Sequence, residues 1–489
     1  MKPLYLLAAI CGAGLTMFSS CSAPEPVQTP PNIIYILADD LGYGDLGCYG
    51  QEVVQTPNLD RLAEQGMLFT EHYAGSTVCA PSRSVLMTGR HTGHTAIRGN
   101  ASPVPGGRDL PSGIVTMAEL LQEAGYTTGI FGKWGLGARG TEGVPGNQGF
   151  DEFLGYLDQG RAHRYYPDYL IHNGEKFPLE GNDLVSTVTY APDVIQEHTL
   201  EFIRENSDTT FFAYVPFIIP HAELIAPEDT FMRMYEGTFP EEEAWGTENE
   251  GGSIYAGNDY GDPDFRIAGY ASQERPRQVF AAMVTRLDHY VGEIMEELEK
   301  QGIAGNTLVL FSSDNGPHLE GGADPDFFNS NGPLRGYKRD LYEGGIRVPM
   351  IARWPGMIEP GSRSDHVSAF WDIMPTVAEI AGVPVPGIRD GISMLPALLG
   401  SDTQEKHNHL YWEFHEQNGK VALRRGKWKA VRVNVFDTAR TATELYDLEA
   451  DPGEENNLAG EHPEVVRQME RIMKAARKES EAYPFPVVW

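Results

Sequence analysis

Short apolar runs alternate along the chain with segments in which apolar residues recur every three or four positions. Residues 32–40 (NIIYILADD) begin with a continuous apolar run, which is typical of a strand buried on both faces. Residues 57–69 show helical spacing followed by a strand pattern. Residues 115–133, 191–217 and 275–316 repeat the order helix, turn and strand. The alternation predicts an α/β fold with a large, mixed but mostly parallel sheet between layers of helices.

The pattern changes near residue 401. Residues 409–433 alternate apolar and polar positions and are rich in aromatic residues, and a charged helical pattern closes the chain. This predicts a smaller antiparallel α+β subdomain over residues 401–489, after a larger domain over residues 32–400. A chain of 489 residues is long enough for both.

The N-terminus has the features of an export signal. A basic start, a short apolar run and small residues before Cys21 predict a signal peptide over residues 1–20. Residues 18–21 (FSSC) resemble a bacterial lipobox, in which the cysteine is lipidated, and plain cleavage with secretion is the alternative. The proline-rich residues 21–31 would then be a tether. We therefore expect an exported protein, either periplasmic or a cell-surface lipoprotein.

The charge of the chain limits the choice of partners. The 38 basic residues against 69 acidic ones give a formal charge of −31. This argues against nucleic acid as a partner, because phosphate binding needs a basic face. A small anion can still bind, since a local site can be positive on a negative protein.

Polar residues follow four of the predicted strands, directly or within a few positions. In chain order they are Asp39 and Asp40, Lys133, His221, and Asp314 and Asn315. Ligands bind at the carboxyl ends of strands in an open parallel sheet, so we expect these side chains to share one edge. Asp and Asn after a strand often form turns, but that alternative has to hold at every strand separately.

Four of these residues, Asp39, Asp40, Asp314 and Asn315, form an all-oxygen set. Oxygen ligands suit a hard divalent cation, and a set this rich in protein ligands favours Ca²⁺ over Mg²⁺. Three carboxylates packed together would repel one another without a cation between them. We therefore expect a calcium site at this edge of the sheet.

Residues 76–90 (STVCAPSRSVLMTGR) contain one of the two cysteines that lie beyond the predicted signal and tether, and a disulfide is one use for such a pair. Pro81 suits a first helical turn and Gly89 follows the last apolar residues, which places Cys79 at a helix N-terminus. Unpaired N–H groups there favour an anion, so a thiolate with its pKa lowered by that field and by Arg83 is one candidate. A buried, inert cysteine is the alternative.

The segment CAPSRSVLMTGR also resembles the C-x-P-S-R…T-G signature of the type I sulfatases. Five further motifs of that family occur in order: residues 39–45 (DDLGYGD), 132–137 (GKWGLG), 220–221 (PH), 313–316 (SDNG) and 336–349 (GYKRDLYEGGIRVP). The resemblance covers nearly all of the chain from residue 31. It implies the fold of the alkaline phosphatase superfamily and an enzyme that hydrolyses sulfate monoesters.

In this family a dedicated maturation enzyme oxidises the cysteine to formylglycine, which hydrates to a geminal diol. The resemblance implies that Cys79 becomes this nucleophile, with one diol oxygen on the metal, and that Arg83 stabilises the hydrated aldehyde. Lys133 and Lys338 look like the cations that bind the sulfate oxygens. His221 looks like the histidine near the leaving-group oxygen, a candidate general acid. The four-residue oxygen set described above matches the calcium ligands.

One position departs from the family pattern. A histidine commonly stands two residues after the first of these lysines, and this chain has Gly135. That histidine often contacts the second diol oxygen, so the proton acceptor has to come from elsewhere. His94 and His163 are the candidate replacements, and a structural role is the alternative for each.

The expected substrate is a sulfated oligosaccharide, from a glycosaminoglycan-like or algal glycan. Aromatic side chains stack on sugar rings and polar ones bind the hydroxyls, which selects His94, His163, Arg164, Tyr166, Trp412, Glu413 and His415. For residues 410–415 (LYWEFH), ordinary strand pairing is the alternative. Gly135 together with residues 161–170 (RAHRYYPDYL) resembles bacterial sulfatases acting on galactose or N-acetylgalactosamine sulfates. We expect exo-action on the 4-sulfate, with the 6-sulfate as the alternative.

Two other functions compete with this interpretation. A phosphomonoester or phosphonate hydrolase of the same superfamily would use two zinc ions and a Thr or Ser nucleophile, whereas this chain has ligands for one metal and a cysteine. A lipoprotein that binds sulfated glycans without turnover is suggested only by Gly135.

Overall fold

The computed structural model describes Met1 and residues 30–102, 108–240, 243–246, 257–387 and 389–485. The predicted signal peptide, Cys21 and most of the predicted tether lie outside these residues, so their roles stay predictions. From Pro31 onward the chain forms one compact unit. Within the described residues, no helix combines the length and apolar character needed to cross a membrane.

A ten-stranded sheet lies at the centre of the described residues, in the order β11-β2-β10-β9-β1-β8-β4-β5-β6-β7. The five strands from β9 to β5 run parallel, β10 is antiparallel to β9 and β2, and β6 and β7 add an antiparallel edge. The predicted mixed, mostly parallel sheet is confirmed. The strands are β1 (Asn32–Ala38), β2 (Met67–Phe69), β4 (Thr127–Lys133), β5 (Glu152–Tyr156), β6 (Tyr169–His172), β7 (Glu175–Pro178), β8 (Phe211–Pro216), β9 (Thr307–Ser313), β10 (Met350–Arg353) and β11 (Ser362–Ser364).

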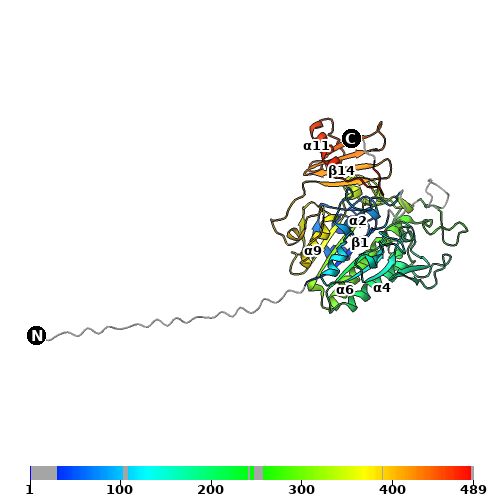
Figure 1. The fold of residues 1–489 in the computed structure, drawn as a ribbon. Coiled ribbons are helices and arrows are strands. Elements are labelled where there is room, and N and C mark those ends of the chain that lie inside the picture. Colours follow the sequence, from blue (N-terminus) through cyan, green and yellow to red (C-terminus); the bar gives the residue numbers. More distant parts are fainter. Residues whose placement is uncertain (2–29, 103–107, 241–242, 247–256, 388, 486–489) are drawn as a thin grey trace. The chain divides into compact units, whose positions relative to one another are not determined.

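Helices cover both faces of this sheet, as the continuous apolar runs predicted. In β1, Ile33 and Tyr35 pack in one hydrophobic cluster with α2, α3 and α9, whereas Ile34 and Ile36 pack in another with α1, α4 and α6. Figure 1 shows α2 and α9 on one side of β1 and α4 and α6 on the other. The α-helices are α1 (Pro57–Glu64), α2 (Cys79–Thr88), α3 (Met117–Glu123), α4 (Ala191–Glu205), α5 (Thr230–Met234), α6 (Pro276–Lys300), α7 (Pro325–Phe328), α8 (Glu343–Ile346), α9 (Ile373–Ala381), α10 (Leu395–Leu398) and α11 (Pro463–Ala475).

The remaining elements before residue 401 are two short strands and several 3-10 helices. Strands β3 (His72–Tyr73) and β12 (Ser368–Ala369) pair in parallel. The 3-10 helices are η1 (Gly47–Tyr49), η2 (Pro145–Asn147), η3 (Arg161–His163), η4 (Ala304–Asn306), η5 (Glu320–Gly322) and η6 (Phe370–Asp372).

Helix α2 begins and ends where the sequence predicts. Val78 is extended and Cys79 is the first helical residue, so the cysteine lies in the turn whose backbone N–H groups have no helical partner. Gly89 ends the helix in the left-handed conformation, with φ of 63°, which glycine adopts without strain.

A second, antiparallel sheet near the C-terminus contains β13 (Leu410–Phe414), β14 (Lys420–Arg425), β15 (Trp428–Val433) and β16 (Ala442–Asp447). The predicted small antiparallel sheet is therefore confirmed, while the boundary at residue 401 stays a prediction. Both faces are covered: Leu423 packs under Met469 and Met473 of α11, whereas Trp412 and Ala422 belong to the core of the large sheet. Figure 1 shows β14 beside α11.

A buried ion network joins this sheet to the large domain. Lys429 of β15 places Nζ 2.8 Å from Oε1 of Glu343 and 3.2 Å from Oε1 of Glu454, and all three side chains are fully enclosed. Glu343 also accepts a hydrogen bond of 2.6 Å from the Tyr73 hydroxyl. Burial by itself would raise the pKa of Glu343, but the Lys429 ammonium overrides it and lowers the pKa to about 2.

We expect Lys429→Met to lower the free energy of unfolding by about 3–5 kcal/mol, because it removes the cation that Glu343 and Glu454 share and leaves Glu343 with Arg347 at 3.4 Å. Lys427→Met is the matched control: Lys427 pairs with Asp447 at the surface, and loss of such a pair changes stability by less than about 1 kcal/mol. Urea denaturation followed by circular dichroism measures both. Equal stability changes in the two variants would show that the network does not hold the sheet.

Candidate active site

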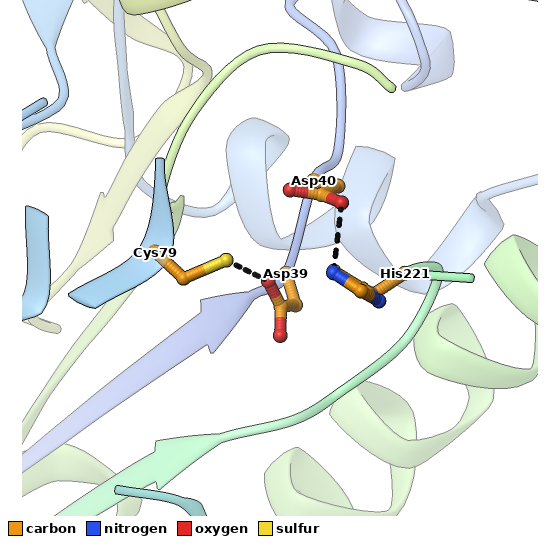
Figure 2. A group of neighbouring side chains, drawn as sticks. All are labelled: Asp39, Asp40, Cys79 and His221. Carbon is orange, nitrogen blue, oxygen red and sulfur yellow. Dashed lines mark hydrogen bonds and ion pairs between the residues drawn. The ribbon is translucent and has the colours of Figure 1, made fainter. Parts of the chain in front are cut away.

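Three elements deliver reactive side chains to one edge of the large sheet. Asp39 and Asp40 follow β1, Cys79 opens α2, and His221 follows β8 (Figure 2). Cys79 Sγ lies 3.3 Å from Asp39 Oδ1. His221 Nε2 lies 3.4 Å from Asp40 Oδ2. The predicted convergence of strand ends is therefore seen in the structure.

Three cationic side chains neutralise the buried carboxylates of this edge. Lys133 Nζ lies 2.6 Å from Asp39 Oδ2, and Lys338 Nζ lies 2.6 Å from Asp40 Oδ2. Arg83 donates from Nε and Nη2 to one oxygen of Asp314, at 3.0 and 2.8 Å. The three positive and three negative charges balance, so a bound divalent cation would make the site positive and attractive to an anion although the chain carries −31 overall.

Burial and these neighbours set the protonation states. Burial would raise the pKa of Asp39, but the Lys133 ammonium overrides it and holds the pKa well below its usual range. Burial, and then the Asp39 carboxylate, raise the pKa of Asp314. The same two causes raise the pKa of the Cys79 thiol. Both causes oppose the thiolate considered from the sequence, and Cys79 is buried, as the alternative to it expected.

The oxygen donors fit a hard cation. Asn315 Nδ2 donates to Asp40 Oδ1 at 2.7 Å, while Asn315 Oδ1 is buried and has no hydrogen-bond partner among the described residues. Asp314 Oδ1 accepts the Asp40 backbone N–H at 3.2 Å. Asp39, Asp40, Cys79 and His221 each offer one atom within 4.8 Å of the others. An orphaned amide oxygen beside clustered carboxylates is a suitable ligand set for a divalent metal.

Histidine rings line the other side of the carboxylates. The His163 ring stacks on His221 with centroids 5.2 Å apart and an interplanar angle of 13°. Nδ1 of His163 lies 2.9 Å from the Ala268 carbonyl oxygen, and burial lowers the pKa of His163 to about 4. Of the two histidines proposed to replace a side chain at residue 135, His163 therefore lies beside the site.

His221 has a restricted ring. Its Nδ1 contacts the Ala222 carbonyl oxygen, which favours a proton on Nδ1. Burial, and then Lys338, hold the pKa of His221 well below its usual value. The predicted general-acid role needs a proton on Nε2, and it stays a prediction.

Two residues near His221 were not selected from the sequence. The His318 ring lies 5.9 Å from the His221 ring, and its Nε2 is 3.0 Å from the Pro220 carbonyl oxygen. Its position two residues after the SDNG motif is a signal that sequence reasoning could have used. Tyr270 contacts the His163 ring at 4.9 Å, and no motif surrounds it.

A side chain at residue 135 would have to displace the Gln159 amide. Gly135 has a φ of 74°, and a Cβ there would lie 2.2 Å from the amide nitrogen of Gln159. The Gln159 amide thus occupies the space that a side chain at residue 135 would fill. His94, the other suggested replacement, instead contacts Asp390 at 2.9 Å and is not brought to the catalytic group.

Arg164 and Tyr166 were expected to contact sugar, and the structure corrects this. Arg164 is fully buried, where it forms an ion pair with Glu223 and donates to the Asn258 carbonyl oxygen at 2.8 Å. The Tyr166 ring packs against Tyr190 in the core. A buried guanidinium requires a carboxylate and carbonyl partners, so Arg164 orders the chain behind His163.

The expected contacts from residues 410–415 are also wrong. Trp412 is 0% exposed, and its indole N–H donates to the Ala74 carbonyl oxygen at 3.0 Å. Glu413 is enclosed between Arg98 at 3.0 Å and Arg477 at 2.9 Å, and His415 contacts Glu413 at 3.0 Å. The alternative of ordinary strand packing is correct here, because both faces of this sheet are covered.

Comparisons with known proteins agree with this geometry. Residues 31–383 match the Sulfatase family, and residues 336–479 match the family N-sulphoglucosamine sulphohydrolase, C-terminal. The chain is 33% identical to arylsulfatase A of Homo sapiens, covering 94% of this chain and 90% of that protein. It is 32% identical to N-acetylgalactosamine-6-O-sulfatase of Bacteroides thetaiotaomicron, covering 91% and 93%. The crystal structure of Ps i-CgsB superposes with a TM-score of 0.75 at 29% identity, covering 94% and 95%.

The fold and the strand-end site define a hydrolase of sulfuric esters. The chain belongs to the sulfatase family, which confirms the resemblance carried by the six sequence motifs.

We expect a divalent cation to stabilise the protein through the oxygen donors. At a Ca²⁺ concentration a hundredfold above Kd, mass action adds about 2.7 kcal/mol to the free energy of unfolding and raises Tm. Asn315→Ala should reduce this gain, because it removes the orphaned amide oxygen beside the carboxylates. Calorimetry with and without Ca²⁺ measures the shift in Tm. Asn306→Ala is the control, because Asn306 is exposed and directly precedes β9. A shift of equal size in Asn315→Ala would remove Asn315 from the ligand set.

Proposed function

We propose that the chain hydrolyses sulfate monoesters of carbohydrates with formylglycine made from Cys79. The observation that carries the proposal is the place of Cys79, enclosed at the start of α2, 3.3 Å from Asp39. A thiol whose pKa is raised by burial and by a carboxylate is a poor nucleophile. The hydrated aldehyde of formylglycine supplies an oxygen nucleophile at the same position, provided that a maturation enzyme acts on the chain.

The proposed reaction has two bond exchanges. In the first exchange, a diol oxygen gives up its proton and forms a bond to sulfur, while the bond from sulfur to the sugar oxygen breaks and the sugar oxygen takes up a proton. Loss of the proton from the other diol oxygen then breaks the carbon–oxygen bond to sulfate and restores the aldehyde. The second exchange explains why the chemistry uses an aldehyde: a serine or cysteine would be left as a stable sulfo-enzyme.

Each cationic side chain has a role in this proposal. Lys133 and Lys338 bind the sulfate oxygens and neutralise the charge that gathers on them in the transition state. Arg83 fixes Asp314 and also donates to the Lys133 carbonyl oxygen at 2.6 Å, so it ties α2 to the end of β4. His221 and His163 face the leaving group. Asp39, Asp40, Asp314 and Asn315 would hold one Ca²⁺, which supplies charge stabilisation, with Mg²⁺ as the alternative.

The proposed substrate is a galactose or N-acetylgalactosamine sulfate at the end of a glycan chain. Our sequence-based preference is the 4-sulfate. The 6-sulfate is the second candidate, because one relative is named N-acetylgalactosamine-6-O-sulfatase at 32% identity and another N-acetylgalactosamine-6-sulfatase at 33%. Export with lipidation of Cys21 is part of the same proposal, since an exported enzyme would encounter glycan fragments outside the cytoplasm.

Conversion of Cys79 to formylglycine should lower the mass of the peptide that contains it by about 18 Da, because the thiol is replaced by an aldehyde. Mass spectrometry of protein from a host with a maturation enzyme measures this. Cys79→Ala should then lose turnover of an aryl sulfate, while Cys48→Ala, which changes the other free cysteine of the described residues, should keep it. Undiminished turnover by Cys79→Ala would refute the proposed nucleophile.

Defined sugars separate the substrate hypotheses. We expect matured protein to release sulfate from N-acetylgalactosamine 4-sulfate faster than from the 6-sulfate, and to leave N-acetylglucosamine 6-sulfate intact. The ratio of kcat/KM values, from ion chromatography of sulfate, gives the answer. Cleavage of the gluco-configured sugar alone would overturn the proposed substrate class, and a phosphate monoester preferred over every sulfate, with a zinc requirement, would favour the phosphohydrolase.

A further inference from the structure

A second group of metal-binding side chains lies at the far end of α2. His91 and His94 follow the C-terminus of this helix, and their rings stack with centroids 4.4 Å apart at 24°. Cys79 opens the same helix, and ten helical residues span about 15 Å. The two histidines are therefore remote from the catalytic carboxylates.

Asp390 completes the group. Its Oδ1 lies 2.9 Å from His94 Nδ1 and 3.5 Å from His91 Nε2. Its Oδ2 accepts the His91 backbone N–H at 3.0 Å, and its own N–H donates to the Gly89 carbonyl oxygen at 3.0 Å. These contacts fix the carboxylate against both rings, and the three residues each offer one atom within 4.8 Å of the others.

The protonation states suit metal binding. Burial lowers the pKa of His91 to about 4, so its imidazole is neutral at neutral pH. Burial would raise the pKa of Asp390, but the hydrogen bond from His94 holds it below its usual range, so the carboxylate is ionised. His409 and the His407–Asp372 pair also face this corner. Neutral imidazole and ionised carboxylate are the forms that ligate a metal.

We propose that His91, His94 and Asp390 form a second metal site, which takes a transition metal such as Zn²⁺ and holds the loop around Asp390 against the end of α2. Zinc binds imidazole nitrogen and carboxylate oxygen at about 2.0–2.2 Å, and ligand atoms around one such ion lie roughly 3–3.5 Å apart, as the two contacts to Asp390 Oδ1 do. Imidazole ligands favour zinc over calcium, which prefers oxygen. The site is thus chemically distinct from the all-oxygen set at the catalytic edge.

Two hydrogen bonds have to change when a metal binds. The Gly93 N–H donates to His91 Nδ1 at 3.2 Å, which puts the ring proton on Nε2. Coordination through Nε2 moves that proton to Nδ1, so the Gly93 contact lengthens. For His94, the proton now shared with Asp390 moves to Nε2.

Isothermal titration of the full chain with Zn²⁺ tests the proposal, with excess Ca²⁺ present to occupy the oxygen donors. We expect one Zn²⁺ per chain, at least tenfold weaker binding in Asp390→Asn and His94→Ala, and a rise in Tm with Zn²⁺ that both variants lose. Asp390→Asn keeps the size of the side chain, so its Zn²⁺ affinity can be measured even if His94→Ala does not fold.

His289→Gln is the matched control, because it also removes one histidine, and His289 lies half-exposed on α6 beside Glu293 and not among the three proposed ligands. It should bind Zn²⁺ as the unchanged protein does. Absence of saturable Zn²⁺ binding overturns the proposal, and so does binding that Asp390→Asn leaves unchanged. In either case the three side chains form only a hydrogen-bonded brace between loops.

Discussion

The balance of buried charge at the strand ends is the constraint on which the rest of the molecule depends. Asp39, Asp40 and Asp314 are each fully enclosed, and each is matched by a cationic side chain from another element. A carboxylate buried without its partner costs several kcal/mol. Segments more than 200 residues apart in the chain must therefore meet at one edge. The order of strands β9, β1, β8 and β4 in the sheet is what brings them together.

Side chains that touch no catalytic group still shape the site. Glu223 accepts hydrogen bonds from the Tyr260 hydroxyl at 2.7 Å and from the Ala271 backbone at 2.9 Å, in addition to its ion pair with Arg164. These bonds clasp residues 258–271 against the segment that carries His163. The Ala268 carbonyl oxygen thereby reaches the His163 ring and fixes its orientation over His221. The reactive edge thus depends on a polar core behind it.

The parts of the fold that were predictable are those governed by periodicity and by strand ends. The apolar run of residues 32–38 and the residues that bound α2 are local signals, and the polar residues after four strands predicted that the side chains of the candidate site converge. The side chains against which a given residue packs were not predictable. An alternating aromatic strand has the same sequence pattern whether its second face is exposed to water or packs against another domain. Trp412 and Arg164 were misjudged for this reason, since the sequence does not show Ala74 beside the indole or Glu223 beside the guanidinium.

The burial of Cys79 determines whether its proposed oxidation comes before or after folding. Its side chain is 1% exposed, with the carboxylates and lysines packed around it. No second enzyme can reach an atom so enclosed, so the proposed oxidation has to happen on the nascent or still-unfolded polypeptide. On this proposal, folding sets the time limit for maturation, and a molecule that folds before it is oxidised retains the thiol and lacks the proposed nucleophile.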